Sequence, residues 1–248
     1  LHIRGGGLQG IDYTLPVASA QVKSALLLAG LNAEGEIVVR EGAPSRDHTE
    51  RFLRWLGQPL TVSGGSVRLA EAQPWPGFDY CLPGDLSGAA FLLAAAALVE
   101  GSDVLVRGVG LNPSRAGILD ALRRMGARLE VEPGREEPGG EPVGDLQVRA
   151  GPLRAIEVGG ASIPNLIDEL PILAVLATQA EGQTVVRDAA ELRVKESDRI
   201  ASLATGLRAL GARFEPTALS CRVRRICGAH GWRARATIAS PWRWLSPV

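Results

Sequence analysis

The sequence predicts an α/β protein made of repeated β-α-β-α-β-β units, divided into two partial domains. Three features indicate this class. Apolar helical segments ending in Glu-Gly recur three times, a short β-branched run ending in arginine follows each of them, and an amphipathic segment ending in glycine comes next. Self-similarity of this kind is typical of repeat architectures, in which neighbouring units share a core.

The first helix of each unit is expected to be buried. Its residues are apolar around nearly the whole helix, which is typical of a helix enclosed on all sides. Two layers of sheet around the helices would enclose them in this way. The three first helices are predicted at residues 21–35, 84–101 and 164–182.

A strand and a second helix follow in each unit. The second helices end at a glycine, which readily adopts the left-handed conformation of a helix C-cap. Pro-Ser-Arg precedes the first two of these glycines at the same distance, and an apolar stripe from Ile200 to Leu210 marks the second helix of the third unit. The strands are predicted at residues 37–40, 104–107 and 184–187, and the terminal glycines are Gly57, Gly126 and Gly211.

Further short strands are expected to open and close the units. A loop rich in Pro, Gly and Glu, residues 132–143, is expected to interrupt the second unit. The third unit loses its pattern after Glu215, where its closing strands should follow. The opening strands are predicted at residues 78–82 and 155–158, and the closing strands at residues 60–62, 67–69, 128–131 and 145–148.

Composition limits the kind of protein. The 248 residues, 46% of them hydrophobic, suffice for one large domain or two ordinary ones. The longest apolar run, residues 89–99, is too short to cross a bilayer. The N-terminus has neither a signal-peptide pattern nor an initiator Met, which suggests a fragment. Three cysteines outside any metal-binding spacing favour the reducing cytoplasm.

Residues 219–248 differ in composition from the rest of the chain. They hold six arginines, no acidic residue and three of the five tryptophans, although the whole chain has a net charge of zero. Residues 1–218 therefore carry 21 basic and 27 acidic residues. We expect this tail to be out of frame and poorly ordered. A genuine nucleic-acid or membrane-surface arm is the alternative.

Two lysines, Lys23 and Lys195, stand among 25 arginines. An ammonium is a compact charge whose pKa shifts readily on burial, whereas a guanidinium is a planar fork, so the two are not interchangeable. The use of lysine in Ser-Ala-Gln-Val-Lys-Ser and in Arg-Val-Lys-Glu-Ser-Asp-Arg suggests a need for ammonium chemistry. The alternative is that both lysines lie on solvated helix faces.

Acidic and basic residues in two later motifs could carry chemistry. Asp168 and Glu169 interrupt an apolar segment, and burial raises the pKa of a carboxyl group, which suits a general base. An acidic helix start facing water is the alternative. Lys195 and Arg199 lie one turn apart at a helix start, a natural anion site, and Glu196 between them could donate a proton. A solvated, salt-bridged face is the alternative.

Other residues at predicted helix starts could contact an anion, although serine also caps helices in ordinary proteins. They are Ser19, Gln21, Ser45 and Arg46. His48 is expected to be structural, and Gly84-Asp85 to begin a helix. The sequence has no Gly-rich phosphate fingerprint, zinc pattern or Ser-His-Asp arrangement.

Five motifs follow one another over residues 1–218. They are Leu-Pro-Val-Ala-Ser-Ala-Gln-Val-Lys-Ser from Leu15, Ser-Arg-Asp-His-Thr-Glu from Ser45, Pro-Gly-Asp-Leu-Ser from Pro83, Ile-Pro-Asn-Leu-Ile-Asp-Glu-Leu-Pro from Ile163, and Arg-Val-Lys-Glu-Ser-Asp-Arg from Arg193. They resemble the enolpyruvyl transferases, most closely the EPSP synthases (3-phosphoshikimate 1-carboxyvinyltransferases). The relatives that act on UDP-N-acetylglucosamine are an alternative. The resemblance implies an inside-out α/β barrel of two domains, each of three units, with the active site between them.

The resemblance also implies an activity and roles for individual residues. The family transfers the enolpyruvyl group of phosphoenolpyruvate to the 5-hydroxyl of shikimate 3-phosphate, a step of aromatic amino acid biosynthesis, without a metal or cofactor. Asp168 would accept the hydroxyl proton, and Glu196 would exchange protons at the methylene carbon. Gln21 and Arg199 would contact phosphoenolpyruvate. The shikimate 3-phosphate site would comprise Ser19, Ala20, Gln21, Ser45, Arg46, Asp168 and Lys195.

Two departures from the family lead us to expect an inactive fragment. The first is that the sequence starts inside the family's upper domain, without the lysine, arginines and Gly-rich segment that the resemblance implies for phosphoenolpyruvate binding; the second is a missing motif. Residues 1–82 would form about one unit of the upper domain, and residues 83–218 about two units of the lower domain. The family's Gly-Asp-His-Arg motif should follow Glu215 but is missing. One choice of codons for residues 235–248, read two bases later, encodes that motif, so we infer a frame slip near Leu219. A non-catalytic ligand-binding fragment is the alternative; in either case we expect a monomer with small-molecule partners, and neither nucleic acid nor membrane.

Overall fold

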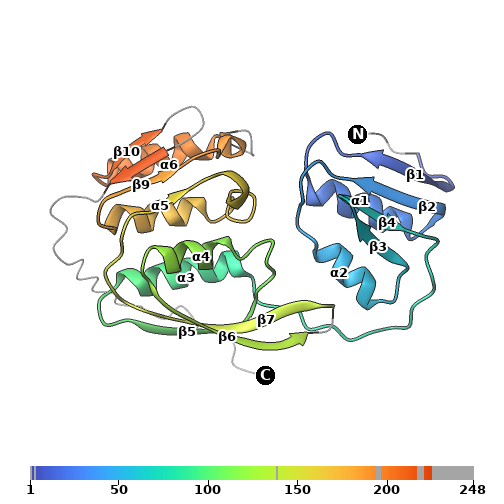
Figure 1. Ribbon diagram of the computed structural model, residues 1–248, viewed down its shortest axis with the longest axis horizontal. Coiled ribbons are helices and arrows are strands. Elements are labelled where there is room, and N and C mark those ends of the chain that lie inside the picture. Colours follow the sequence, from blue (N-terminus) through green and yellow to red (C-terminus); the bar gives the residue numbers. More distant parts are fainter. Residues whose placement is uncertain (1, 3, 138, 194–196, 217–220, 225–248) are drawn as a thin grey trace, which may run out of the picture.

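The computed structural model of the chain describes residues 2, 4–137, 139–193, 197–216 and 221–224. The elements form two halves, each with its own hydrophobic core (Figure 1). The core of the N-terminal half, residues 8–69, centres on Leu27, Val39 and Leu53. The larger core of the C-terminal half, residues 84–224, is built mainly from Leu and Ala side chains of its helices.

The N-terminal half is one complete unit. Its four strands form a sheet in the order β1-β2-β4-β3, in which β1 is parallel to β2 and the other pairs are antiparallel. The elements are β1 (Leu8–Thr14), α1 (Ala20–Gly30), β2 (Ala33–Arg40), α2 (His48–Trp55), β3 (Leu60–Ser63) and β4 (Ser66–Leu69).

The C-terminal half contains two further units. The second comprises α3 (Leu86–Leu98), β5 (Asp103–Gly110), α4 (Gly117–Arg124), β6 (Arg128–Glu137) and β7 (Glu141–Arg149), with the sheet order β5-β7-β6. The third comprises β8 (Glu157–Val158), the 3₁₀ helix η1 (Gly160–Ser162), α5 (Leu170–Gln179), β9 (Gln183–Val186), the 3₁₀ helix η2 (Ala190–Arg193), α6 (Arg199–Ala209), β10 (Arg213–Pro216) and β11 (Cys221–Arg224). Its order is β8-β9-β11-β10.

The three units share one topology, which confirms the predicted repeat. In the first and third units, the opening strand is parallel to the next strand and the closing hairpin is antiparallel to it. In the second unit, the parallel partner is reduced to one bridge between Gly84 and Val109. The same C-cap ends all three second helices, because Gly57, Gly126 and Gly211 have positive φ angles of 74°, 86° and 86°.

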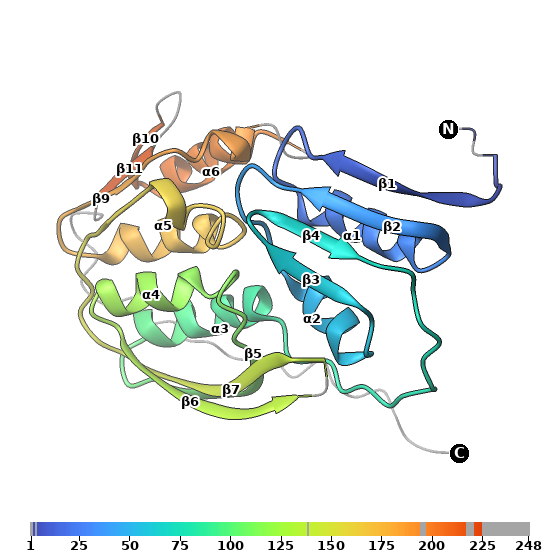
Figure 2. The same cartoon turned by 45° about the vertical axis from the view of Figure 1, so that its right-hand side comes forward.

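The predicted enclosure of the first helices holds for α5 but not for α1 or α3, since Phe91 and Leu92 on one face of α3 are 59% and 57% exposed. Figure 1 shows α3, α4 and α5 lying between the sheet of β5 to β7 and the sheet that contains β9 and β10, with α6 beside the latter. In the N-terminal half a single sheet covers α1 and α2 (Figure 2). Val22 and Leu28 of α1 are therefore 44% and 49% exposed.

Three strand predictions require correction. Residues 78–82 form no strand, because Phe78 and Tyr80 pack edge-on against Phe52 of α2. Residues 132–143 are not a loop: β6 and β7 run through them as one long hairpin, with a bulge after Pro133. The third unit closes with β10 and β11, so residues 221–224 of the expected tail pair with β9 and β10. The remainder of the tail lies outside the described residues.

No helix in the described parts of the chain has both the length and the apolar character needed to cross a membrane.

Candidate active site between the two halves

An acidic side chain of the C-terminal half meets an arginine of the N-terminal half. Arg46 Nη2 lies 2.5 Å from Asp168 Oδ2, although the two residues are 122 positions apart in sequence. Arg199, the first residue of α6, places Nη1 at 3.6 Å from Asp168 Oδ1. Asp168 is 30% exposed, so its carboxylate lies between two guanidinium groups and remains accessible from solvent.

Local structure holds Asp168 in this position. The buried side chains of Leu166 and Ile167 anchor the turns before α5, which begins with Pro171 in its first turn. The next residue, Glu169, is 3% exposed and accepts a hydrogen bond from the hydroxyl of Ser87 on α3. Burial raises the pKa of Glu169. The two adjacent acids therefore differ in burial, since Asp168 is accessible to solvent and Glu169 is not.

A hydrogen-bonded chain links Glu169 to a repeat motif. Arg115 Nη2 donates to Ser87 Oγ at 2.5 Å and lies 3.6 Å from Asp85 Oδ1. Asp85 caps α3 by accepting from the backbone of Ser87 and Gly88, which confirms the predicted helix start. Arg115 belongs to the second Pro-Ser-Arg motif, so the arginines of both motifs lie close to the acidic pair.

The expected anion-binding residues lie near the N-terminus of α1. Ser19 Oγ accepts from Val22 N at 3.3 Å, so it caps the helix, while Ala20 and Gln21 begin it. Ser45 does not cap α2, which begins later, at His48. Its hydroxyl instead donates to Glu41.

Lys23 is neither exposed nor solvated. It is 1% exposed, and its Nζ lies 2.9 Å from Glu41 Oε2 and 2.6 Å from Glu50 Oε1. Because Glu41 also binds the hydroxyl of Ser45, this buried network ties α1, the end of β2, the loop before α2 and α2 together. The expectation of a lysine on a solvated face is therefore wrong for Lys23.

Three consecutive residues of the N-terminal half contact the C-terminal half. Besides Arg46, the carboxylate of Asp47 accepts from Asn112 Nδ2 at 2.8 Å, and His48 Nδ1 lies 2.6 Å from Glu141 Oε1. Arg51 adds a hydrogen bond from Nη1 to the carbonyl of Gly140 at 3.0 Å. We call residues 46–48 the bridging loop. The predicted structural role of His48 is supported by its contact with Glu141.

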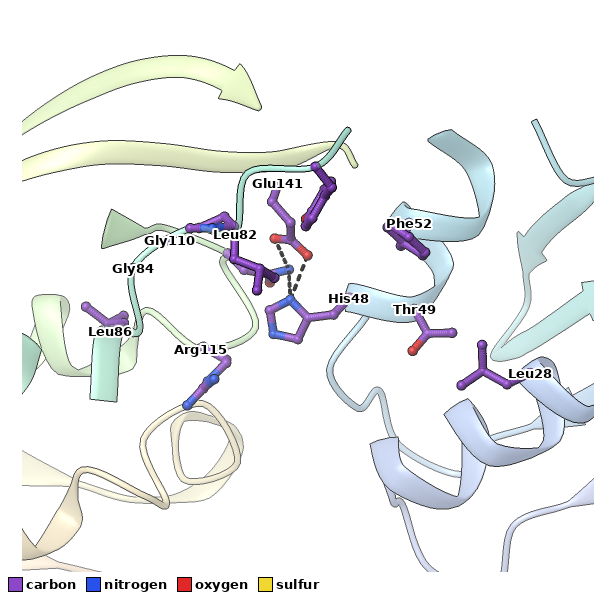
Figure 3. Close-up of a pocket in the computed structure, with 13 residues that line it drawn as sticks. Leu28, His48, Thr49, Phe52, Leu82, Gly84, Leu86, Gly110, Arg115 and Glu141 are labelled. Atoms are coloured by element: carbon purple, nitrogen blue, oxygen red, sulfur yellow. Dashed lines mark hydrogen bonds and ion pairs between the residues drawn. The ribbon is translucent and has the colours of Figure 1, made fainter. Parts of the chain in front are cut away.

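A cavity of about 560 Å³ lies beside the bridging loop. Figure 3 shows His48 projecting from α2 towards Glu141, with Leu82 and Arg115 on the facing side. Apolar side chains of both halves and of the connecting segment line most of it, including Leu28, Phe52 and Leu86. His48 Nε2 is buried and has no hydrogen-bond partner among the described residues.

Two of the expected site residues, Lys195 and Glu196, lie outside the described residues. The described ranges contain no group of three His, Cys, Asp or Glu side chains that could hold a metal ion. Sequence reasoning missed Asn112, Glu141 and Glu41. The repeated Pro-Ser-Arg was a signal for Asn112, since Asn112 immediately precedes the second copy.

The sequence profile of the family described as EPSP synthase (3-phosphoshikimate 1-carboxyvinyltransferase) matches residues 1–232. The chain belongs to the EPSP synthase family. The match extends past Leu219, near which we inferred a frame slip. Family members named 3-phosphoshikimate 1-carboxyvinyltransferase include one from Bacillus subtilis, 53% identical over 223 residues, and one from Xanthomonas euvesicatoria, 54% identical over 218 residues. These alignments cover 90% and 88% of this chain but 52% and 49% of the relatives, so the chain spans about half their length.

Solved structures agree with the family assignment and with the predicted fold class. EPSP synthase from Acinetobacter baumannii superimposes with a TM-score of 0.82 at 45% identity, over 88% of this chain and 49% of that one. The enolpyruvyl transferase NikO from Streptomyces tendae has a TM-score of 0.62 at 24% identity, over 80% of this chain and 44% of that one. The second likeness shows the fold alone. The chain therefore has the enolpyruvyl transferase fold.

Proposed function

We propose that the chain carries the shikimate 3-phosphate side of a carboxyvinyltransferase. The observation that supports this most strongly is the meeting of Arg46, Asp168 and Arg199 between the halves. Two cations around one accessible carboxylate suit a reaction in which an anionic substrate binds and a hydroxyl loses its proton. The relatives are named 3-phosphoshikimate 1-carboxyvinyltransferase. The reaction that we propose is transfer of the enolpyruvyl group from phosphoenolpyruvate to shikimate 3-phosphate.

The residues divide between binding and proton transfer. Ser19, Ala20 and Gln21 at the start of α1, with Ser45 and Arg46, hold shikimate 3-phosphate, and Lys195 contacts it. The helix N-terminus adds favourable electrostatics for the phosphate. Gln21 and Arg199 contact phosphoenolpyruvate.

Asp168 accepts the proton of the attacking 5-hydroxyl. Glu196 delivers a proton to the methylene carbon and removes one when phosphate leaves, which balances addition and elimination.

We also propose that the chain is divided between two domains. Residues 1–82 form part of an upper domain, and residues 83–218 together with β11 (Cys221–Arg224) form part of a lower one. The protein works as a monomer in the cytoplasm, on small molecules, with neither nucleic acid nor membrane as partner. Because the chain spans about half the length of its relatives, we propose that it binds shikimate 3-phosphate without turnover.

Calorimetry with shikimate 3-phosphate tests this proposal. We expect saturable binding that Arg46→Met weakens by at least about tenfold, because a charge-assisted contact to phosphate is lost. Arg40→Met is the matched control. Arg40 pairs with Asp12 on the exposed surface of the N-terminal sheet, so this variant should bind shikimate 3-phosphate like the parent. A phosphate-release assay with phosphoenolpyruvate should show no turnover. Binding of UDP-N-acetylglucosamine in preference to shikimate 3-phosphate would overturn the substrate assignment.

A further inference from the structure

Asn112 lies at the centre of the contact between the halves. It is 2% exposed, and its Nδ2 donates to Asp47 Oδ1 at 2.8 Å and to Glu141 Oε2 at 3.0 Å. Its Oδ1 accepts from the backbone N–H and the hydroxyl of Ser114, at 2.9 and 2.6 Å. The amide therefore directs its donor group at two carboxylates from opposite halves and its acceptor into its own loop.

The partners of Asn112 lead directly to the candidate active site. Asp47 Oδ2 accepts from Arg51 Nε at 2.9 Å, and Arg51 also reaches the hairpin tip through the carbonyl of Gly140. Burial opposes ionisation of Asp47, but the hydrogen bonds from Arg51 and Asn112 outweigh it and lower the pKa of this carboxyl. Asp47 is thus held on both oxygens, and Arg46 is the preceding residue in the same loop.

We infer that Asn112 is a positioning residue, which holds the bridging loop so that Arg46 meets Asp168. It touches neither of these residues and acts through Asp47 and Glu141. The positioning of the bridging loop follows from the hydrogen bonds of Asn112. Its effect on the binding of shikimate 3-phosphate rests on the proposed function. An amide is the side chain that suits this place, because only a donor can join two facing carboxylates.

Asn112→Asp isolates this role. The new carboxylate keeps the shape of the side chain and can still accept from Ser114, so the loop of the second unit is preserved. It removes the donor and sets three carboxylates against one another, at Asp47, Glu141 and position 112. Arg51 and His48 on α2 are the basic side chains that face this group, with Arg115 elsewhere around the cavity.

Gln147→Glu is the matched control. Gln147 Nε2 donates to Asp103 Oδ1 at 2.6 Å, also between an amide and a carboxylate, but on the exposed face of the sheet that contains β5 and β7. The same chemical change there should leave the bridging loop untouched.

Calorimetry at about pH 7.5 should show shikimate 3-phosphate binding at least about tenfold weaker for Asn112→Asp than for the parent, with Gln147→Glu within about twofold. At about pH 5, a proton shared among the three carboxylates restores a donor, so the affinity should return to within about threefold of the parent at that pH. A merely structural defect would not be repaired by acid. Equal binding by the two variants, or a loss that persists at low pH, would overturn the inference.

Hydrogen exchange of the ligand-free chain separates this inference from the proposed function. In Asn112→Asp, amides of residues 46–52 should exchange at least about tenfold faster, because the bridging loop has lost its support, while those of β5 stay unchanged. If the parent fails to bind shikimate 3-phosphate but this difference appears, the proposed substrate is wrong and the positioning role stands. If exchange in residues 46–52 is unchanged, the positioning role is wrong.

Discussion

Arg46 and Asp168 form an ion pair across the two halves, with Nη2 and Oδ2 2.5 Å apart and both side chains 30% exposed. The bridging loop carries two further contacts to the C-terminal half within the next two residues, from Asp47 to Asn112 and from His48 to Glu141. The bridging loop therefore sets the distance between Arg46 and Asp168. Changes in this loop are expected to alter the site and the contact between the halves together.

The first prediction concerns the strength of this ion pair. In a double-mutant cycle with Arg46→Met and Asp168→Asn, we expect a coupling free energy of about 1–2 kcal/mol, because the contact is charge-assisted and partly shielded from water. Unfolding in urea, followed by the change in tryptophan fluorescence, measures it.

The matched cycle uses Arg40 and Asp12, whose guanidinium and carboxylate lie 2.7 Å apart and whose side chains are 46% and 53% exposed. Exposed pairs contribute about 0.2–1 kcal/mol. A coupling for Arg46 and Asp168 no larger than that of the control would contradict the first prediction.

The second prediction concerns the buried ammonium of Lys23. Lys23→Met leaves the carboxylates of Glu41 and Glu50 buried without their cation, and removing one partner from such a network costs about 3–5 kcal/mol. The free energy of unfolding, measured by urea denaturation, should fall by that amount. The triple variant Lys23→Met, Glu41→Gln, Glu50→Gln should recover more than half of the loss, since no uncompensated charge remains.

The surface pair of Arg68 and Glu36 is the control for Lys23, because its side chains are 45% and 46% exposed. Arg68→Met should lower the free energy of unfolding by less than about 1 kcal/mol. Equal losses for Lys23→Met and Arg68→Met would show that the buried network does not support this half.

Local sequence signals predicted the units but not the contacts between them. The glycines after the second helices and the strands before them are short-range features, and the structure confirms them in all three units. The two strands of the β6–β7 hairpin were predicted, but their extension through residues 132–143 was missed, because Pro133 and neighbouring glycines are typical of loops. In the structure a bulge after Pro133 absorbs the proline and the ladder continues to Glu137.

The acids and cations of the site depend on tertiary placement. Arg46 and Asp168 could be singled out individually, from a repeated motif and from an interrupted apolar segment. Their meeting could be inferred only through resemblance to a family, since 122 residues separate them. The repeated motif marked the loop of Asn112 but not its contacts, because its partners come from the bridging loop and from the unpredicted extension of the β6–β7 hairpin.

The third prediction concerns the pH dependence of stability caused by Glu169. Burial raises the pKa of this carboxyl in the folded state. The contribution of Glu169 to the free energy of unfolding is therefore complete below the usual carboxyl pKa of about 4.3. It is lost as pH rises through the higher pKa that this carboxyl has in the folded protein. Glu169→Gln, which stays neutral, should gain stability relative to the parent over that pH window, as measured by thermal unfolding at a series of pH values.

Glu157→Gln should show the opposite trend. The hydrogen bond from Arg187 lowers the pKa of Glu157, so the parent's advantage is present above the usual carboxyl pKa and disappears as pH falls. Parallel pH profiles for the two variants would contradict the assignment of Glu169 as a carboxyl that resists ionisation.

The fourth prediction concerns the tip of the β6–β7 hairpin. Gly139 has a φ of 101°, and a Cβ there would lie 2.5 Å from Tyr80 Cε2. Tyr80 packs on Phe52 and Trp55, with ring centroids 5.4 and 5.8 Å away, so it cannot move without loss of those contacts. Gly139→Ala should therefore lower the free energy of unfolding by about 2–4 kcal/mol, from backbone strain and displaced packing together.

Gly101→Ala separates the two causes, because Gly101 has a φ of 79° but nothing lies within 4 Å of the added Cβ. The free energy of unfolding of Gly101→Ala should fall only by the backbone strain, about 1 kcal/mol. In Gly139→Ala, but not in Gly101→Ala, the tip is pushed away from α2 and the hydrogen bond from Arg51 to Gly140 weakens. The amides of α2 should then exchange faster in Gly139→Ala alone. Equal exchange in the two variants would mean that the hairpin tip does not support α2, and that the bridging loop is held by its own contacts.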